Sequence, residues 1–262
     1  MPHTISRGTV QIILMAGLLA GSAGISSAQT LVEQSAEARF QLDLQVPDAA
    51  LLRFIPAGWT LNVSTQGNAK GANLRVIFID RLTINDADGT PVGRTGSSRL
   101  VYLAVPVTNT DGENVQLIIG GLTEAVEDAP GPFGMYLPVT THLMERSSTS
   151  SGHSVMDSQD WVFEAETGER LEMHITYERG VNNRRAPRDV KFYSAKNPDF
   201  YQISRQEQVL EVLRNVTMNP PDRVTTFSFS GGGGSYSVLF DGTERVLSWD
   251  NIVWLNRSVL LP

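Results

Sequence analysis

The feature that most constrains the fold is a repeated alternation of apolar and polar residues. In residues 40–46, and again in residues 171–178, every second residue is apolar. This period of two is the pattern of a β-strand with one buried face. Residues 74–79 are nearly continuously apolar, as expected for a strand buried on both sides. The same reasoning predicts further strands over residues 100–107, 115–119, 224–229, 236–240 and 246–255.

Turn and helix signals are fewer. Residues 109–112 end in Asp111 and Gly112 and predict the loop of a hairpin. A short helix is expected from Asp48 to Phe54, and a longer one over residues 204–215, where apolar residues recur at helical spacing. The four glycines of residues 231–234 predict a floppy hairpin tip. Many strands with a few short helices indicate a mainly β fold, either a barrel or a sandwich.

Residues 1–28 have the layout of a secretory signal. One arginine, Arg7, precedes an apolar run over residues 10–19, and small residues lead to Ala28. A transmembrane anchor is the alternative, but glycines dilute the run and no basic cluster follows it. We therefore expect cleavage after Ala28, with no stable membrane anchor in the mature chain. Residues 29–262 would then form a single domain that is exported to a bacterial periplasm or to the medium.

Composition narrows the class of partner. The chain contains no cysteine, so its stability rests on an apolar core rather than on disulfides. Its formal net charge is −7, and removal of Arg7 with the signal makes it one unit more negative. An acidic chain without a basic face is unsuited to neutralising phosphates, which argues against a nucleic-acid partner. A small-molecule ligand remains the expected partner, and the oligomeric state stays open.

Three short segments stand out in order along the chain: the Asp48 helix with the following turn at Pro56, the turn over residues 131–136, and the closing strands over residues 243–262. Together they resemble the acetoacetate decarboxylase superfamily. The resemblance spans residues 39–262. It implies a large, cone-like β-barrel with a few short helices and a small-molecule pocket inside.

The chemistry of that family does not transfer. Its decarboxylases form a Schiff base between a buried lysine and a β-keto acid, and a second lysine lowers the pKa of the first. The resemblance places this lysine pair near residues 160–164 and a pocket glutamate near residues 100–104. Neither segment holds the expected residue, and the lysines of the chain are Lys70, Lys191 and Lys196.

Lys191 is the one lysine with neighbours that could activate it. Arg184, Arg185 and Arg188 are close in sequence and could depress its pKa. The alternative is a solvated lysine on the surface of a strand, which is the usual place of lysine.

A second candidate site lies on one strand, where Glu172, His174, Thr176 and Glu178 share a face. In a barrel with a wet interior this face, or else the Leu171–Tyr177 face, would line the cavity, with His174 as acid, base or ligand. In a packed barrel the polar face simply meets solvent.

Other site types have weaker signals. The histidines show no spacing typical of a metal site, and residues 231–234 lack the lysine and helix of a phosphate loop. The glutamates at residues 164, 166, 169 and 172 are explained by a charged hairpin without glycosidase chemistry. No serine-hydrolase motif is present. We therefore expect no cofactor and no metal site.

Two functions follow from the barrel hypothesis. The protein is either a divergent lyase acting on a keto acid or other carbonyl compound, or a non-catalytic binding or carrier protein. A secreted β-sandwich interaction module is the third alternative. The sequence leaves open whether the chain is an enzyme.

Overall fold

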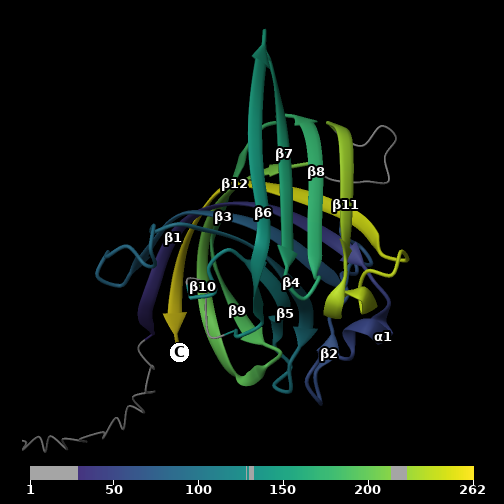
Figure 1. Ribbon diagram of the computed structural model, residues 1–262. Helices are drawn as coiled ribbons and strands as arrows, with labels where there is room; N and C mark the ends of the chain where they lie inside the picture. The colour runs from purple at the N-terminus through teal and green to yellow at the C-terminus, as the bar shows by residue number, and fades with distance from the viewer. Residues whose placement is uncertain (1–28, 128, 130–132, 214–222) are drawn as a thin grey trace, which may run out of the picture.

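The computed structural model describes residues 29–127, 129, 133–213 and 223–262, so the expected signal segment lies outside the described residues. A 12-stranded sheet dominates the fold (Figure 1). No helix in the described part of the chain has both the length and the apolar character needed to cross a membrane. The elements are β1 (Thr30–Gln45), α1 (Asp48–Leu51), β2 (Thr60–Leu61), β3 (Leu74–Asp86), β4 (Ser98–Thr108), β5 (Asn114–Thr123), β6 (Tyr136–Ser151), β7 (Ser154–Ala165), β8 (Arg170–Glu178), β9 (Asn183–Ser194), β10 (Asn197–Val212), β11 (Val224–Gly232), the 3-10 helix η1 (Gly234–Val238) and β12 (Arg245–Leu261).

Part of this sheet closes into a barrel. The strands follow one another in the order β5, β9, β10, β12, β1, β3 and β4, and β4 pairs again with β5. The β5–β9 contact is parallel and short, with Gln116 opposite Phe192, whereas the other contacts of the ring are antiparallel. The structure thus confirms the predicted mainly β barrel, and the sandwich alternative is wrong.

Short strand β2 pairs with the edge of β4, and the other four strands form a second wall outside the barrel. Strand β6 joins β5 through a parallel contact over Tyr136–Pro138, and β7, β8 and β11 follow beside it. The β6–β7 hairpin reaches well beyond the barrel (Figure 1). Trp161 of this wall packs on Phe78 of β3, with ring centroids 5.7 Å apart. The largest apolar cluster combines side chains of the second wall with side chains of β1, β3, β4, β5 and β12, so it lies between the two walls.

Alternation assigns each barrel strand an outer and an inner face. In β1 the side chains of Phe40, Leu42 and Leu44 are fully buried in the core between the walls. Their neighbours Arg39 and Asp43 point the other way, into the barrel, where both line hollows. The predicted alternation is therefore confirmed, and its polar face is the barrel interior.

Two sequence predictions for the second half of the chain are wrong. Residues 204–212 form part of strand β10, not a helix, because they pair with both β9 and β12; residues 214 and 215 lie outside the described residues. Residues 236–240 do not form a strand, since η1 begins at Gly234.

Gly234, the first residue of η1 and the last of the four glycines, is closely packed, which contradicts the predicted floppy tip. A Cβ atom on Gly234 would lie 2.2 Å from the Glu169 carboxylate. That carboxylate accepts hydrogen bonds from Ser235 N at 2.8 Å and Ser235 Oγ at 2.9 Å. Burial alone would raise the pKa of Glu169, but hydrogen bonds from Thr167 and Ser235 hold it at about 2.

Two predictions for short segments, a hairpin loop and a helix, are confirmed in large part. The hairpin loop around residues 109–112 joins β4 to β5, and Asn109 Oδ1 accepts the backbone N–H groups of Asp111 and Glu113. The first predicted helix is real but ends at Leu51, three residues before Phe54.

Candidate functional site

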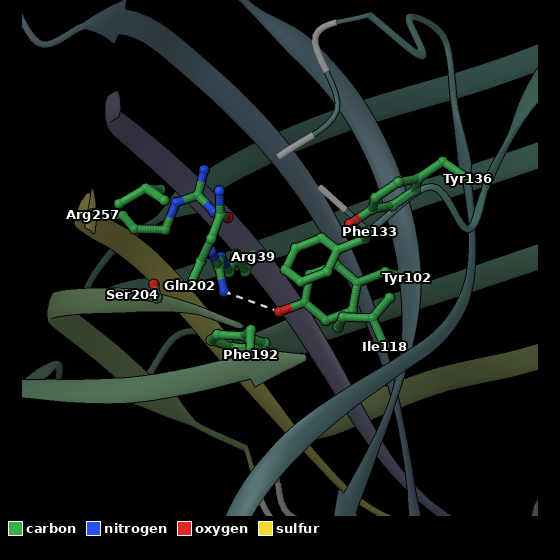
Figure 2. Close-up of a pocket in the computed structure, with 10 residues that line it drawn as sticks. Arg39, Tyr102, Ile118, Phe133, Tyr136, Phe192, Gln202, Ser204 and Arg257 are labelled. Carbon is green, nitrogen blue, oxygen red and sulfur yellow. Dashed lines mark hydrogen bonds between the residues drawn. The ribbon is translucent and has the colours of Figure 1, made fainter. Parts of the chain in front are cut away.

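A narrow cavity lies inside the barrel, next to Tyr136 at the start of β6. Its volume is about 20 Å³, room for about one water molecule. Strands β1, β4, β5, β6, β9, β10 and β12 all contribute side chains, so the cavity exists only because the ring closes. Its lining consists of Arg39, Tyr102, Ile118, Phe133, Tyr136, Phe192, Gln202, Ser204, Arg257 and Val259 (Figure 2).

Two of the lining arginines belong to a buried charge cluster, which we call the arginine cluster: Arg39, Arg81, Arg257, Glu33 and Glu37. Arg39 Nε donates to Glu37 Oε2 at 2.6 Å, and Arg257 Nε lies 3.0 Å from Glu37 Oε1. Arg81 Nη2 lies 2.6 Å from Glu33 Oε1, which also pairs with Arg257. Glu37 and Arg81 are fully buried.

Among the described residues, the arginine cluster carries one positive charge in excess, because three guanidinium groups face two carboxylates. Burial alone would raise the pKa of Glu37, but Arg257, Arg39, Arg81 and the Ser35 hydroxyl together lower it to about 2. Glu37 is therefore ionised at neutral pH. An unbalanced buried cation is costly, and one anion in the cavity would neutralise it.

Two phenols complete the polar side of the cavity. Arg39 Nη1 points at the Tyr102 hydroxyl at 3.4 Å (Figure 2). The hydroxyl of Tyr136 is buried, and no hydrogen-bond partner for it exists among the described residues. Burial raises the pKa of Tyr136 well above its usual value, and the neighbouring Tyr102 adds to this. Tyr136 thus stays a neutral hydrogen-bond donor with no acceptor in the described part of the chain, which is a costly arrangement for a buried group.

Aromatic rings form the apolar part of the cavity lining. Phe133 and Phe192 meet with ring centroids 6.5 Å apart, and Tyr102 meets Phe192 at 6.4 Å. The site therefore combines cationic and phenolic donors with aromatic rings. This combination suits a small organic anion with an apolar body.

Lys191 lies elsewhere. It alternates with Phe192 on β9 and so points out of the barrel, where its Nζ lies 2.7 Å from Glu113 and 4.9 Å from the Tyr201 ring centroid. The hydrogen bond to Glu113 raises the pKa of Lys191, so the predicted depression by neighbouring arginines is wrong. Lys191 is a surface ion-pair residue.

The predicted cavity face on β8 is also wrong. Leu171, Met173, Ile175 and Tyr177 fill the core between the two walls. On the other face, Glu172 pairs with Arg170 at 2.8 Å. Because β8 belongs to the second wall, neither face borders the barrel cavity.

His174 lies in a hydrogen-bonded chain on the outer surface. Its Nδ1 is 2.6 Å from Asp160 Oδ1, and its Nε2 is 3.1 Å from Thr226 Oγ1. The order of these groups is that of a catalytic triad, but His174 and Asp160 are each more than a third exposed on a flat sheet face. These hydrogen bonds therefore link β7, β8 and β11 on the solvent-exposed face of the second wall.

The segments expected to hold the lysine pair and the glutamate have different surroundings. Residues 160–164 lie on β7, with Trp161 and Phe163 in the core. Residues 100–104 lie on β4 and supply Tyr102 to the cavity. No lysine lines the cavity, and within the described ranges no group of three His, Asp or Glu residues is placed to hold a metal ion.

The sequence reasoning missed the residues that form the site. Arg39 carries a usable signal, because it occupies the polar face of a strand whose other face is entirely apolar. Arg257 shares one face of β12 with Leu255 and Val259, so it is a charged residue on an otherwise apolar face. Tyr136 has no such signal, since an aromatic residue at a strand start usually packs in a core.

Known proteins resemble this chain in fold but hardly in sequence. No protein-family model matches the sequence, and no curated protein matches it. Among solved structures, the enduracididine biosynthesis enzyme MppR aligns at a TM-score of 0.50 and 11% identity, covering 97% of this chain and 95% of that one. An acetoacetate decarboxylase-like enzyme from Sphingomonas wittichii RW1 aligns at 0.50 and 10% identity, covering 88% and 91%. The chain therefore has the acetoacetate decarboxylase-like fold.

Proposed function

We propose that the protein binds a small carboxylic acid of the oxo-acid class inside the barrel. The carboxylate would lie against Arg39 and Arg257, and one ligand oxygen would accept the Tyr136 hydroxyl. The buried, unpartnered Tyr136 hydroxyl next to a surplus positive charge is the observation that carries this proposal. In support, the structure of MppR, which has a similar fold, contains the condensation product of pyruvate and imidazole 4-carboxaldehyde.

The site favours binding over decarboxylation. Loss of CO₂ is accelerated only by contacts that strengthen in the transition state. Guanidinium groups that hold the carboxylate stabilise the charged acid before reaction and so oppose its departure. A binding or carrier role is therefore the function that we propose, in preference to a divergent lyase.

The cavity must widen to admit an acid of this size. A volume of about 20 Å³ is smaller than any oxo acid. Phe133 and Phe192 form the apolar side of the cavity and have no polar partners to lose, so a change of their rotamers is the least costly way to enlarge it.

Tyr136→Phe tests the proposal directly. We expect the affinity for pyruvate or acetoacetate, measured by calorimetry, to fall about 10- to 100-fold, the usual effect of losing one hydrogen bond to a charged group. Thermal stability should hold or rise, because the substitution removes a buried hydroxyl without a partner. Tyr236→Phe is the matched control, since this buried tyrosine lies in the core between the walls. Equal affinities of Tyr136→Phe and the unaltered protein would contradict the proposed site.

No Schiff base should form. An iminium requires an uncharged primary amine, and Lys191 is held charged by Glu113 at the surface. Borohydride treatment with acetoacetate, followed by peptide mass mapping, should yield no reduced adduct on any lysine. An adduct on Lys191 would make it a nucleophile and would overturn this prediction.

We also propose that the protein is exported after cleavage at Ala28. The support is the charged, apolar and small-residue order of residues 1–28. N-terminal sequencing of protein from the periplasm or medium should begin at Gln29. A membrane-bound form that retains Met1 would mean that the segment is an anchor.

A further inference from the structure

The barrel interior holds another arginine beyond the cavity. On β9, Arg188 alternates with Val190 and Phe192, and Phe192 lines the cavity, so Arg188 is on the inner face of the strand. Cross-strand pairing places Arg188 opposite Gln206 of β10, and Gln206 opposite Arg257 of β12. Arg188 and Arg257 therefore lie in one row, two strand spacings or about 10 Å apart at the backbone.

Arg188 has no acidic partner in the part of the chain that the structure describes. Neighbouring arginines of the interior are paired: Arg75 Nε lies 3.3 Å from Asp43, and Arg39 binds Glu37. Partial desolvation and the guanidinium groups of Arg75, Arg185 and Arg39 lower the pKa of Arg188, although the residue remains exposed. Arg188 therefore faces like charges, although the chain as a whole is acidic.

An isolated arginine at the surface needs no explanation, because solvent stabilises it. Arg184 shows the ordinary arrangement four residues earlier on β9, where it pairs with Glu207 on the outside of the barrel. Arg188 is also open to solvent, but it is directed toward the inner row and gathers with three other cations. An anion bound at this end of the inner row would offset the repulsion between Arg188 and its neighbours.

We propose that the ligand is a small dicarboxylate, whose first carboxylate binds at Arg39, Arg257 and Tyr136 and whose second binds at Arg188. The inference rests on the proposed function and adds the ligand class. A ligand that carries two negative charges balances the surplus of the arginine cluster and the unpaired charge of Arg188 together. A carbon chain of four or five atoms suits the separation, because Arg257 is held in the arginine cluster while the exposed Arg188 can turn along the same row toward it.

The test compares two acids of equal chain length. 2-Oxoglutarate has a carboxylate at each end, whereas 2-oxopentanoate has only one. We expect calorimetry on the full mature chain to show at least tenfold tighter binding of 2-oxoglutarate, with a stronger dependence on salt. Arg188→Gln should remove most of this preference while changing the affinity for 2-oxopentanoate less than twofold. Arg184→Gln, the outward-facing neighbour, is the control and should leave both affinities unchanged.

The outcomes separate the two proposals. Equal binding of the two acids would overturn the dicarboxylate inference and leave the proposed carboxylate site standing. A loss of affinity for both acids in Arg188→Gln would show that Arg188 does not hold a second carboxylate, and would overturn the inference as well. Binding of neither acid would contradict the proposed function, and the inference would fail with it.

Discussion

Replacing Glu37 with glutamine is expected to lower the free energy of unfolding by about 3–5 kcal/mol, the usual cost of removing one partner from a buried ion pair. Glu37 accepts from Arg39 and Arg257 and is fully buried. After the change, three buried guanidinium groups would face the single carboxylate of Glu33. Urea denaturation followed by tryptophan fluorescence would measure the loss, and Trp161 in the core is a suitable reporter.

The matched control is Glu113→Gln, which breaks the surface ion pair with Lys191. Its effect on the unfolding midpoint should be small, because exposed pairs contribute little. The double change Glu37→Gln with Arg39→Met should cost less than the sum of the single changes, since Arg39 Nε and Nη2 both bind Glu37. Equal unfolding midpoints for Glu37→Gln and the unaltered protein would mean that the arginine cluster is not formed.

The same carboxylate makes stability depend on pH. The folded pKa of Glu37 is about 2, below its ordinary value of 4.5. Its contribution, about 3 kcal/mol from the difference in pKa, is therefore complete above pH 4.5 and is lost as the pH falls toward 2. In Glu37→Gln this acid limb should become shallower. It should not vanish, because Glu169 is also held at about 2.

The sequence predicted strands well where apolar residues mark a buried face. Strands β1 and β8 follow the predicted alternation, and β3, β4 and β5 contain the other predicted apolar segments. The prediction of a helix over residues 204–215 was wrong, because the apolar residues between Val209 and Val216 also fit a helical period of 3.6. Pairing with β9 and β12 decided the outcome, and such long-range contacts are invisible in a local pattern.

The site was harder to predict than the fold. Arg39, Tyr102, Tyr136 and Arg257 lie on four different strands and meet only when β4 returns to β5. The candidates that the sequence offered, His174, Glu172 and Lys191, are polar residues on strands and so stood out locally. Whether such a residue faces solvent or a barrel interior depends on which wall its strand joins. Alternation separates the two faces of a strand but does not say which face is inside.

Gly121→Ala is expected to disturb both the fold and the site. Gly121 lies on β5 opposite Tyr136 of β6, at the parallel contact that joins the second wall to the barrel. A Cβ atom there would be 2.4 Å from Tyr136 Cδ1 and 2.9 Å from the Val101 carbonyl oxygen. Neither separation is tolerable for a carbon atom, so the Tyr136 ring must move. We expect a loss of about 2–3 kcal/mol of stability, as for other overpacked cores.

The affected ring carries the hydroxyl that we assign to the ligand. Gly121→Ala should therefore weaken oxo-acid binding more than Tyr136→Phe does, because the displaced ring also intrudes on a cavity of only about 20 Å³. Tyr136→Ala in the same chain separates the two effects. With the ring absent, Gly121→Ala should cost clearly less stability than it does in the unaltered protein, and the remainder would reflect the Val101 carbonyl. Fully additive stability losses would show that the Tyr136 ring does not rest on Gly121, and the placement of its hydroxyl in the cavity would fall with that contact.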